Sequence, residues 1–298
     1  MEPWILFTIA AAFFQNLRNG LQKSLNSVLS TTGAAYTRFA FGLPFAIIYW
    51  FVLRSVIKDE LNWSWAFWIY AFVGGLAQIL AMMTLLRAFS IRGFAVGTAY
   101  AKTETLQTAI FTVILLGEVI SGQALIAIFV SLIGVFMLSS AKSGTGLKDI
   151  LFSWTQKAAL FGLSSAALLG LAAVSYRGAA LALEGRGALL PAAATLVVAL
   201  TIQTTIVTGY LVFKEKGQLT VVWGNRNKAM LVGIAGMLGS VGWFTAMTLE
   251  NAAHVRALRQ IELVFTLLTS WLIFHERINK AEIGGTVFIV GGVLILLL

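Results

Sequence analysis

Long apolar stretches run through the whole chain and are separated by short polar or glycine-containing segments. A helix needs roughly 20 predominantly apolar residues to cross a bilayer. Ten stretches reach that length, at about residues 3–28, 34–53, 65–88, 93–116, 119–140, 157–182, 188–212, 228–249, 253–274 and 280–298. The pattern therefore predicts an all-α integral membrane protein with ten transmembrane helices.

The composition leaves no room for a sizeable soluble domain beside these helices. Of the 298 residues, 59% are hydrophobic and 11% are charged, whereas a soluble domain has about 45 to 50% apolar and about 25% charged residues. The N-terminal segment, Met1-Glu2-Pro3-Trp4, enters the first apolar stretch without a basic region or a cleavage signal, which indicates a retained membrane helix. Cysteine is absent, which excludes disulfides, thiolate metal sites and thiol catalysis.

The order of the apolar stretches suggests an internal repeat. The two longest breaks are residues 143–156 and 214–228, and the first lies almost at mid-chain. This predicts a first five-helix repeat at residues 1–142, a connecting loop at 143–156 and a second five-helix repeat at 157–298. Shifting the second half onto the first aligns Gly20 with Gly178, Gly75 with Gly233, Glu104 with Glu262, Gly117-Glu118 with His275-Glu276 and Gly134 with Gly292.

An odd number of helices in each repeat makes the second copy insert upside down relative to the first. Two inverted five-helix repeats are typical of secondary transporters, which bind their solute where the repeats meet near the middle of the membrane. The alternative is that Gly and Glu coincide by chance in an apolar sequence of low complexity.

Several polar and charged residues fall inside the predicted spans, where a charge costs about 2.5 to 3.5 kcal/mol on insertion scales and normally faces a cavity or a partner. In the first span, Gln15, Arg18 and Gln22 recur at steps of three or four residues and so form one polar stripe. The stripe suits the wall of a wet cavity, although hydrogen bonds to neighbouring helices would also account for part of it. Arg38 is a further charge, in the second span.

The fourth span opens with a second polar cluster. Glu104 shares a helical face with Tyr100 and Gln107, while Lys102 lies two residues away on another face. The ninth span has a matching cluster at its start.

In that ninth span Arg256, Arg259 and Glu262 are three residues apart, so one helical face carries two guanidiniums and a carboxylate. Arg259 and Glu262 are able to neutralise each other. Arg256 then requires a second anion, either from another helix or from a solute.

Together these charges predict a net-positive cavity that favours a solute with a carboxylate or phosphate, because arginine binds either group through two parallel hydrogen bonds. Burial and neighbouring cations act in opposite directions on the pKa of a carboxyl group, so Glu104 and Glu262 are both candidates to carry a coupling proton, with His254 as a third. The predicted solute-binding residues are Gln15, Arg18, Gln22, Arg38, Tyr100, Lys102, Glu104, Gln107, Arg256, Arg259 and Glu262.

Catalysis has little support in this sequence. An intramembrane enzyme needs a nucleophile with its base, a metal set or paired carboxylates, yet His254 and His275 are the only histidines and His275-Glu276 lacks the second histidine of a zinc-protease helix. A phosphate-binding glycine loop with its lysine is also missing. We therefore expect no enzyme activity, no metal and no cofactor.

The formal charge of +9 falls mostly in short loops near lipid headgroups and does not indicate a nucleic-acid partner.

Two stretches resemble a known family. Residues 104–118 read ETLQTAIFTVILLGE, and Glu262-Leu263-Val264-Phe265 runs on to Phe274-His275-Glu276, each followed by a glycine-containing helix. This resembles the drug/metabolite transporter superfamily and, within it, the ten-helix EamA-type permeases. In that resemblance Glu104 and Glu262 match the glutamate that opens the family motif, and Glu118 and Glu276 match the one that closes it.

Three positions depart from the family pattern. Thr105 and Leu263 stand where the family has proline, which puts a proline-shaped kink in both helices in question, and His275 replaces a glycine. The resemblance implies export of small metabolites, commonly amino acids or related compounds, across the bacterial inner membrane by alternating access.

We therefore expect a secondary transporter that exports a small anionic or zwitterionic metabolite, such as an amino acid or a related compound. The alternatives are a lipid or lipid-precursor flippase and a non-transporting membrane scaffold or signalling subunit. The expected partners are the solute, membrane lipid and a coupling proton, and both a monomer and a homodimer stay open.

Loop charges conflict with the usual orientation of the family. Ten spans place both chain ends on one side, and family members usually keep both in the cytoplasm. The segments that would then be periplasmic carry ten basic residues against three on the other side: Arg92, Lys142, Lys148, Lys157, Lys214, Lys216, Arg226, Lys228, Arg277 and Lys280, against Arg54, Lys58 and Arg186. This is the reverse of the positive-inside rule, and the side on which the termini lie stays open.

Overall fold

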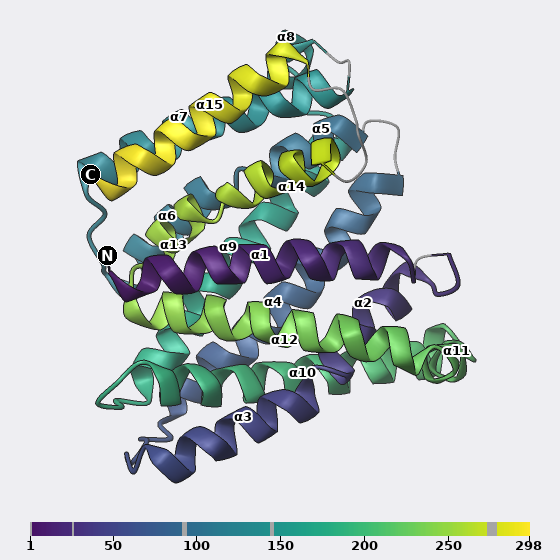
Figure 1. Ribbon diagram of the computed structural model, residues 1–298, viewed down its shortest axis with the longest axis vertical. Helices are drawn as coiled ribbons and strands as arrows, with labels where there is room; N and C mark the ends of the chain where they lie inside the picture. Colours follow the sequence, from purple (N-terminus) through teal and green to yellow (C-terminus); the bar gives the residue numbers. More distant parts are fainter. Residues whose placement is uncertain (1, 26, 91–93, 144–145, 273–278) are drawn as a thin grey trace. The chain divides into compact units, whose positions relative to one another are not determined.

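The computed structural model describes residues 2–25, 27–90, 94–143, 146–272 and 279–298, which form helices and no strands (Figure 1). His275, Glu276 and two of the loop cations, Arg92 and Arg277, lie outside these residues. The helices are α1 (Pro3–Lys23), α2 (Thr31–Ala40), α3 (Leu43–Val56), α4 (Trp65–Ser90), α5 (Phe94–Ala101), α6 (Glu104–Leu116), α7 (Gly122–Ser143), α8 (Leu147–Leu151), α9 (Lys157–Ala182), α10 (Leu189–Lys214), α11 (Gln218–Gly224), α12 (Arg226–Leu249), α13 (Ala252–Leu258), α14 (Ile261–Leu272) and α15 (Lys280–Leu297).

Seven helical stretches of the described chain are long and apolar enough to cross a membrane. They are Thr31–Val56, Trp65–Ala88, Gly122–Ala141, Lys157–Ala182, Leu189–Lys214, Arg226–Leu249 and Lys280–Leu297. Each covers most of one stretch predicted from the hydrophobic pattern. The prediction of an all-α membrane protein is thereby confirmed, with the first of these stretches formed by α2 and α3 together.

Three predicted spans take a different form. The first, α1, ends at Lys23 and not at residue 28, and its polar stripe makes it less hydrophobic than the seven stretches above. The fourth predicted span is divided into α5 and α6, with the break at Lys102-Thr103. The ninth is divided into α13 and α14, with the break at Arg259-Gln260.

Both breaks form without a proline. At the first, the amides of Lys102 and Thr103 donate to carbonyls three residues earlier, at 3.1 Å each. At the second, the amides of Gln260, Glu262 and Leu263 do the same, at 3.2, 2.9 and 3.0 Å. A short run of these tighter hydrogen bonds interrupts the α-helical pattern, so the helices are broken although Thr105 and Leu263 replace the proline of the family.

Backbone contacts divide the chain into two compact units, each with segments from both halves of the sequence. The first unit is Met1–Ile79 with Ser175–Glu250, and the second is Leu80–Val174 with Asn251–Leu298. The boundaries fall within α4, within α9 and between α12 and α13. The sequence repeats at residues 1–142 and 157–298 are a different division of the chain and stay a prediction.

In the first unit, α12 packs along α1 and against α2, α3 and α10. Glycines on α12 permit this close approach. A Cβ atom at Gly242 would lie 2.7 Å from the Phe7 carbonyl oxygen, and one at Gly233 would lie 2.6 Å from the Phe41 carbonyl carbon. Close backbone packing of this kind drives helix association in lipid, where hydrophobicity alone does not.

A buried polar network ties α4, α9 and α10 together within the same unit. Gln78 Oε1 accepts hydrogen bonds from the Tyr176 hydroxyl at 2.9 Å and from Gln203 Nε2 at 2.5 Å, and Gln203 Nε2 also donates to the Tyr176 hydroxyl at 2.9 Å. Tyr176 and Gln203 are only 3% and 2% exposed. Because these groups satisfy one another, they hold the three helices in register.

In the second unit, α7 packs along α15 through glycines on both helices. A Cβ atom at Gly134 would lie 2.5 Å from the Gly285 carbonyl oxygen, and one at Gly285 would lie 2.8 Å from the Gly134 carbonyl oxygen. Further along α15, a Cβ at Gly292 would lie 2.7 Å from the Ala127 carbonyl oxygen. The two backbones are therefore in contact, with no space for side chains between them.

Replacing Gly292 with alanine is expected to lower the thermal stability of the purified protein. The added methyl group would collide with backbone atoms of α7, and overpacking of this kind costs about 1 to 3 kcal/mol. The neighbouring Gly291 has no such contact within 4 Å, so Gly291→Ala is the matched control and should leave the melting temperature in detergent unchanged or slightly raised. Equal melting temperatures for the two variants would contradict the close packing of α7 and α15.

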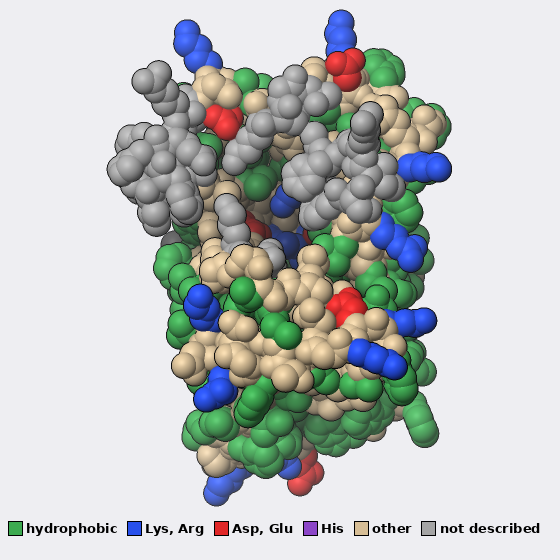
Figure 2. Space-filling model, turned by 90° about the vertical axis from the view of Figure 1, so that its right-hand side faces the viewer, with side chains coloured by type: hydrophobic (Ala, Val, Ile, Leu, Met, Phe, Trp, Pro, Cys, Tyr) green, Lys and Arg blue, Asp and Glu red, His purple; other side chains and the backbone are tan. Residues whose placement is uncertain are grey.

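Helix α11 lies at the right of Figure 1, and Figure 2 shows the molecule from that side. Many Lys and Arg side chains and few Asp and Glu side chains are visible in this view. The residues that flank α11 contribute four exposed cations, Lys214, Lys216, Arg226 and Lys228. Large aromatic side chains are exposed beside them, with Phe213 79% and Trp223 66% exposed. Cations and aromatics at helix ends are typical of a membrane–water interface.

Candidate functional site

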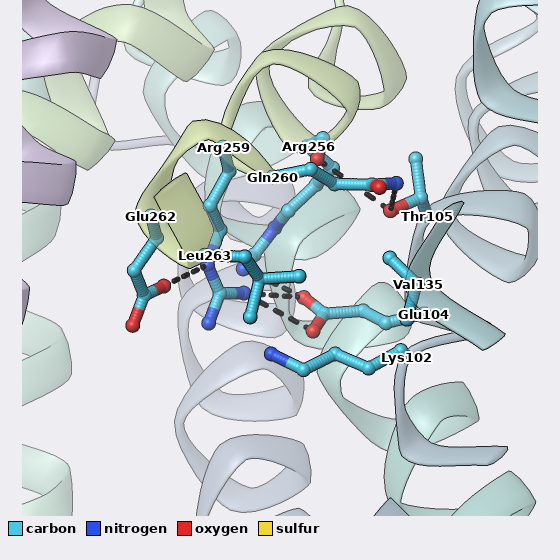
Figure 3. Close-up of a pocket in the computed structure, with 9 residues that line it drawn as sticks. All are labelled: Lys102, Glu104, Thr105, Val135, Arg256, Arg259, Gln260, Glu262 and Leu263. Carbon is cyan, nitrogen blue, oxygen red and sulfur yellow. Dashed lines mark hydrogen bonds and ion pairs between the residues drawn. The ribbon is translucent and has the colours of Figure 1, made fainter. Parts of the chain in front are cut away.

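A pocket in the second unit lies where the two broken helices meet (Figure 3). Its empty volume is about 360 Å³, including the space at its open side. The residues that line it are Lys102, Glu104, Thr105, Val135, Arg256, Arg259, Gln260, Glu262 and Leu263. All but Val135, which is on α7, lie at or next to the α5–α6 and α13–α14 breaks.

Glu104, the first residue of α6, lies at the centre of this pocket. Both of its carboxylate oxygens accept hydrogen bonds from Arg259 Nη1, at 3.0 and 3.1 Å, and Oε1 lies 2.6 Å from Arg256 Nη1. The glutamate side chain is 10% exposed, and those of Arg256 and Arg259 are 12% and 21% exposed. One carboxylate therefore holds two largely buried guanidiniums, through short charge-assisted contacts.

Two further charges surround this centre. Glu262, in the first turn of α14, lies with Oε2 3.5 Å from Arg259 Nε, so Arg259 contacts two carboxylates at once. The Lys102 side chain runs beside that of Glu104 in Figure 3, and its charge acts on the same carboxylate. Three cations against two carboxylates give the pocket a formal net charge of +1.

Uncharged side chains connect the two helix breaks. Gln260 Nε2 donates to Thr105 Oγ1 at 3.3 Å, and Thr105 Oγ1 contacts the Arg256 carbonyl oxygen at 3.5 Å. Gln260 is 8% exposed, and its Oε1 is a buried atom without a hydrogen-bond partner in the described structure. A polar atom of this kind in a pocket wall is suited to a solute that donates a hydrogen bond.

The breaks also bring helix ends to the pocket. α6 and α14 each begin beside it, with Glu104 and Glu262 in their first turns. α13 ends there, with Arg256 in its last turn. Discontinuous helices whose ends face a polar site are typical of secondary transporters.

Comparison with known proteins decides the family. The model of a family described as the EamA-like transporter family matches residues 2–140 and again residues 156–298. The chain belongs to the EamA-like transporter family. It is therefore a member of the drug/metabolite transporter superfamily, and the sequence resemblance is confirmed.

A solved structure described only as the crystal structure of a protein has the same fold as this EamA-family chain. The two superimpose with a TM-score of 0.73 at 17% sequence identity, over 99% of this chain and 95% of the other. At 17% identity this similarity shows a common fold and nothing about function. A search of curated proteins finds no match.

The predicted solute-binding residues of this EamA-family protein fall into both units. The pocket brings together five of them: Lys102, Glu104, Arg256, Arg259 and Glu262. Tyr100 and Gln107 belong to the same unit but do not line the pocket, because their polar groups bond elsewhere. The Tyr100 hydroxyl donates to the Ile150 carbonyl at 3.2 Å, and Gln107 Nε2 donates to Thr103 Oγ1 at 2.9 Å. His254, on α13, is also outside the pocket lining.

The other predicted residues, Gln15, Arg18, Gln22 and Arg38, belong to the first unit. Gln15 Oε1 accepts a hydrogen bond from Trp243 Nε1 at 3.1 Å, which ties α1 to α12. Arg18 and Arg38 both lie against Gly236, where an added Cβ would be 3.3 and 3.4 Å from their side chains. Arg18 Nη2 also donates to Asn19 Oδ1 at 2.6 Å. Their part in solute binding stays a prediction.

Sequence reasoning did not place Thr105, Val135, Gln260 and Leu263 in the site. Thr105 and Gln260 follow Glu104 and Arg259 directly in the chain, and an unbroken helix would direct such neighbours about 100° apart. Gln260 reaches the pocket at the break between α13 and α14, whereas Thr105 lies beside Glu104 in the first turn of α6. Val135 is an apolar residue on α7 with no sequence signal that distinguishes it from its neighbours.

Proposed function

We propose that this protein is a secondary transporter of a small anionic or zwitterionic metabolite, such as an amino acid or a related compound. The observation that carries the proposal is the pair of guanidiniums held by Glu104 in a pocket with a net charge of +1. Arginine binds carboxylates and phosphates through parallel hydrogen bonds.

A zwitterion would use both signs of charge in the pocket. Its carboxylate would contact Arg256, Arg259 or Lys102, and its ammonium group would contact Glu262, which lies on the far side of Arg259 from Glu104 in Figure 3. The buried Oε1 of Gln260 would accept a further hydrogen bond. This arrangement disfavours a purely cationic solute, because three cations line the pocket.

Ten membrane passes in two inverted five-helix repeats are part of the proposal. The passes would be α1, α2 with α3, α4, α5 with α6, α7, α9, α10, α12, α13 with α14, and α15. The match of the family model to each half of the chain supports a repeat. Five passes in each repeat would give the two copies opposite orientations, and alternating access would follow from their rearrangement around the site.

The protein is proposed to lie in a bacterial inner membrane, with the face that carries α11 in the cytoplasm. The four exposed cations around α11 support this orientation through the positive-inside rule. The chain has no cysteine, so a single cysteine at Lys216 or at Lys58 reports its side by labelling with a membrane-impermeant maleimide. We expect Lys216→Cys to react from the cytoplasmic side and Lys58→Cys from the periplasmic side; the opposite result would reverse the orientation.

The proposed function is tested with the purified protein. Thermal-shift measurements against amino acids, organic acids, nucleotides and simple amines should find stabilisation by anionic or zwitterionic compounds and none by amines. Flux of a stabilising compound is then measured in proteoliposomes against empty liposomes. Stabilisation by amines alone would refute the anion site. Movement of a labelled phospholipid, with no flux of a stabilising compound, would instead indicate a flippase.

A further inference from the structure

Glu104 occupies the place that a bound anion would take on Arg256 and Arg259. Its two oxygens accept from Arg259 Nη1, and one of them also contacts Arg256 Nη1. A solute carboxylate or phosphate bound by Nη1 of both guanidiniums would compete with Glu104 for these contacts. Arg259 is further engaged by Glu262 through Nε, at 3.5 Å. The carboxylate of Glu104 is thus a competitor for the solute that is built into the chain.

We propose that the solute anion displaces Glu104 from Arg256 and Arg259, and that Glu104 takes up one proton from water as it is displaced. One anion and one proton then occupy the site together and cross the membrane together. This inference rests on the proposed function and adds that transport of the solute is coupled to a proton. We call Glu104 a latch because it stays bound to the two arginines until the solute anion and the proton have both reached the site.

Repulsion between the two anions is the physical reason for the proton. Two unit charges 4 Å apart interact by about 4 kcal/mol at an effective dielectric constant near 20. Glu104 is 8% exposed, so too little of its carboxylate is hydrated to stabilise the negative charge once it leaves the guanidiniums. A buried carboxylate without a counter-charge is neutralised by protonation.

Charge balance supports the same stoichiometry. The empty pocket carries Lys102, Arg256 and Arg259 against Glu104 and Glu262, a net charge of +1. An anion contributes one negative charge and the proton one positive charge, so the loaded pocket has the same net charge as the empty one. Loading therefore adds no uncompensated charge to a partly buried site, where such charge is costly.

The charged and titratable groups around Glu104 indicate that it, and not Glu262, is the carboxylate that the solute displaces. The α5–α6 break contributes Lys102, α13 contributes both guanidiniums, α14 contributes Glu262 and α7 contributes the apolar Val135. α9 lies against α6 with Gly170 near Thr108. His254, the remaining titratable residue of α13, does not line the pocket. Glu104 contacts both Arg256 and Arg259, and within the pocket Glu262 contacts Arg259 at a longer distance, 3.5 Å.

Proton uptake by the unaltered protein is the first test. The full chain in detergent is titrated with the monovalent anions acetate, L-lactate and L-glutamate by calorimetry near pH 7, in two buffers that differ in ionisation enthalpy. The expected result is uptake of about one proton for each anion bound, with affinity falling about tenfold per unit rise in pH above neutrality. Binding without proton uptake would overturn the latch and leave the proposed transporter intact. If none of the three anions binds at any pH, the anion site itself, and so the proposed function, is refuted.

The Glu104→Gln variant distinguishes a carboxylate that the solute displaces from one that only stabilises the structure. Glutamine resembles the protonated, displaced form of the side chain, so this variant is expected to bind anions with the same affinity from about pH 6 to 8, and at least about tenfold more tightly than the unaltered protein at pH 8. Glu118→Gln is the matched control, because Glu118 lies in the same unit, bonds to Asn251 at 2.9 Å and does not line the pocket. It should keep the full pH dependence. A pH dependence retained by Glu104→Gln, or weaker anion binding at every pH with unchanged melting temperature, would overturn the proposal.

Discussion

Arg259→Ala is expected to reduce solute flux in proteoliposomes to the level of empty liposomes, a loss of at least about 100-fold. Arg259 contacts both Glu104 and Glu262, so its removal takes away the group that links the two carboxylates of the pocket. A charge-assisted contact to a buried guanidinium contributes about 1.5 to 3 kcal/mol, and the solute is proposed to use more than one such contact.

Folding should survive this substitution. Removing one partner of a buried ion pair is costly when it leaves the other charge without a counter-charge. Here Glu104 keeps its 2.6 Å contact with Arg256, so its buried carboxylate still has a cation beside it. Expression and melting temperature are therefore expected near those of the unaltered protein. Arg186→Ala is the matched control, since Arg186 is exposed and outside the pocket, and it should transport normally. Flux by Arg259→Ala within twofold of the unaltered protein would remove Arg259 from the site.

Glu262→Gln is likewise expected to abolish transport while leaving expression and folding near normal. The substitution keeps the shape and hydrogen-bonding capacity of the side chain but removes its charge, so the formal charge of the pocket rises from +1 to +2. Arg259 then has Glu104 as its one carboxylate partner in the pocket and is held by it more strongly. The solute is therefore expected to displace Glu104 from Arg259 less readily.

The readout for Glu262→Gln is flux in proteoliposomes together with the melting temperature. Glu60→Gln is the control, because Glu60 is an exposed glutamate in the segment between α3 and α4. Normal flux in both Glu262→Gln and Arg259→Ala would show that the pocket at the helix breaks is not the transport site. Loss of flux in Glu262→Gln with retained anion binding would place Glu262 in the transport cycle and not in solute binding.

Most of the helices could be predicted from hydrophobicity because a membrane span depends on local composition. Trp65–Ala88 and Lys157–Ala182 agree with the predicted stretches at both ends, and the five other apolar stretches differ from the prediction by a few residues. The breaks at Lys102-Thr103 and Arg259-Gln260 could not be predicted in the same way. The sequence has no proline at either point, and the charged residues there are interpreted, from the sequence alone, as part of continuous spans.

The candidate site was predictable in its residue types but only partly in its pairing. Charges at the start of the fourth and ninth spans indicated a polar site, and Arg259 and Glu262 were expected to interact because they lie one helical turn apart. Their contact is present, at 3.5 Å. The shorter contacts run to Glu104, which is 155 residues from Arg259 in the chain. Tyr100 and Gln107, which share a helical face with Glu104 in the sequence pattern, have hydrogen-bond partners outside the pocket.

By itself, the sequence determined that this chain is an all-helical membrane protein, that its two halves resemble the EamA-type repeat, and that Glu104, Arg256, Arg259 and Glu262 are too polar to face lipid. The first and third of these properties follow from the cost of exposing polar groups to hydrocarbon, which acts on each segment separately, and the second follows from short sequence motifs. Only the tertiary structure decided that one carboxylate holds both guanidiniums. That pairing depends on how α6 packs against α13 and on where each helix breaks, and both are set by contacts between residues far apart in the chain.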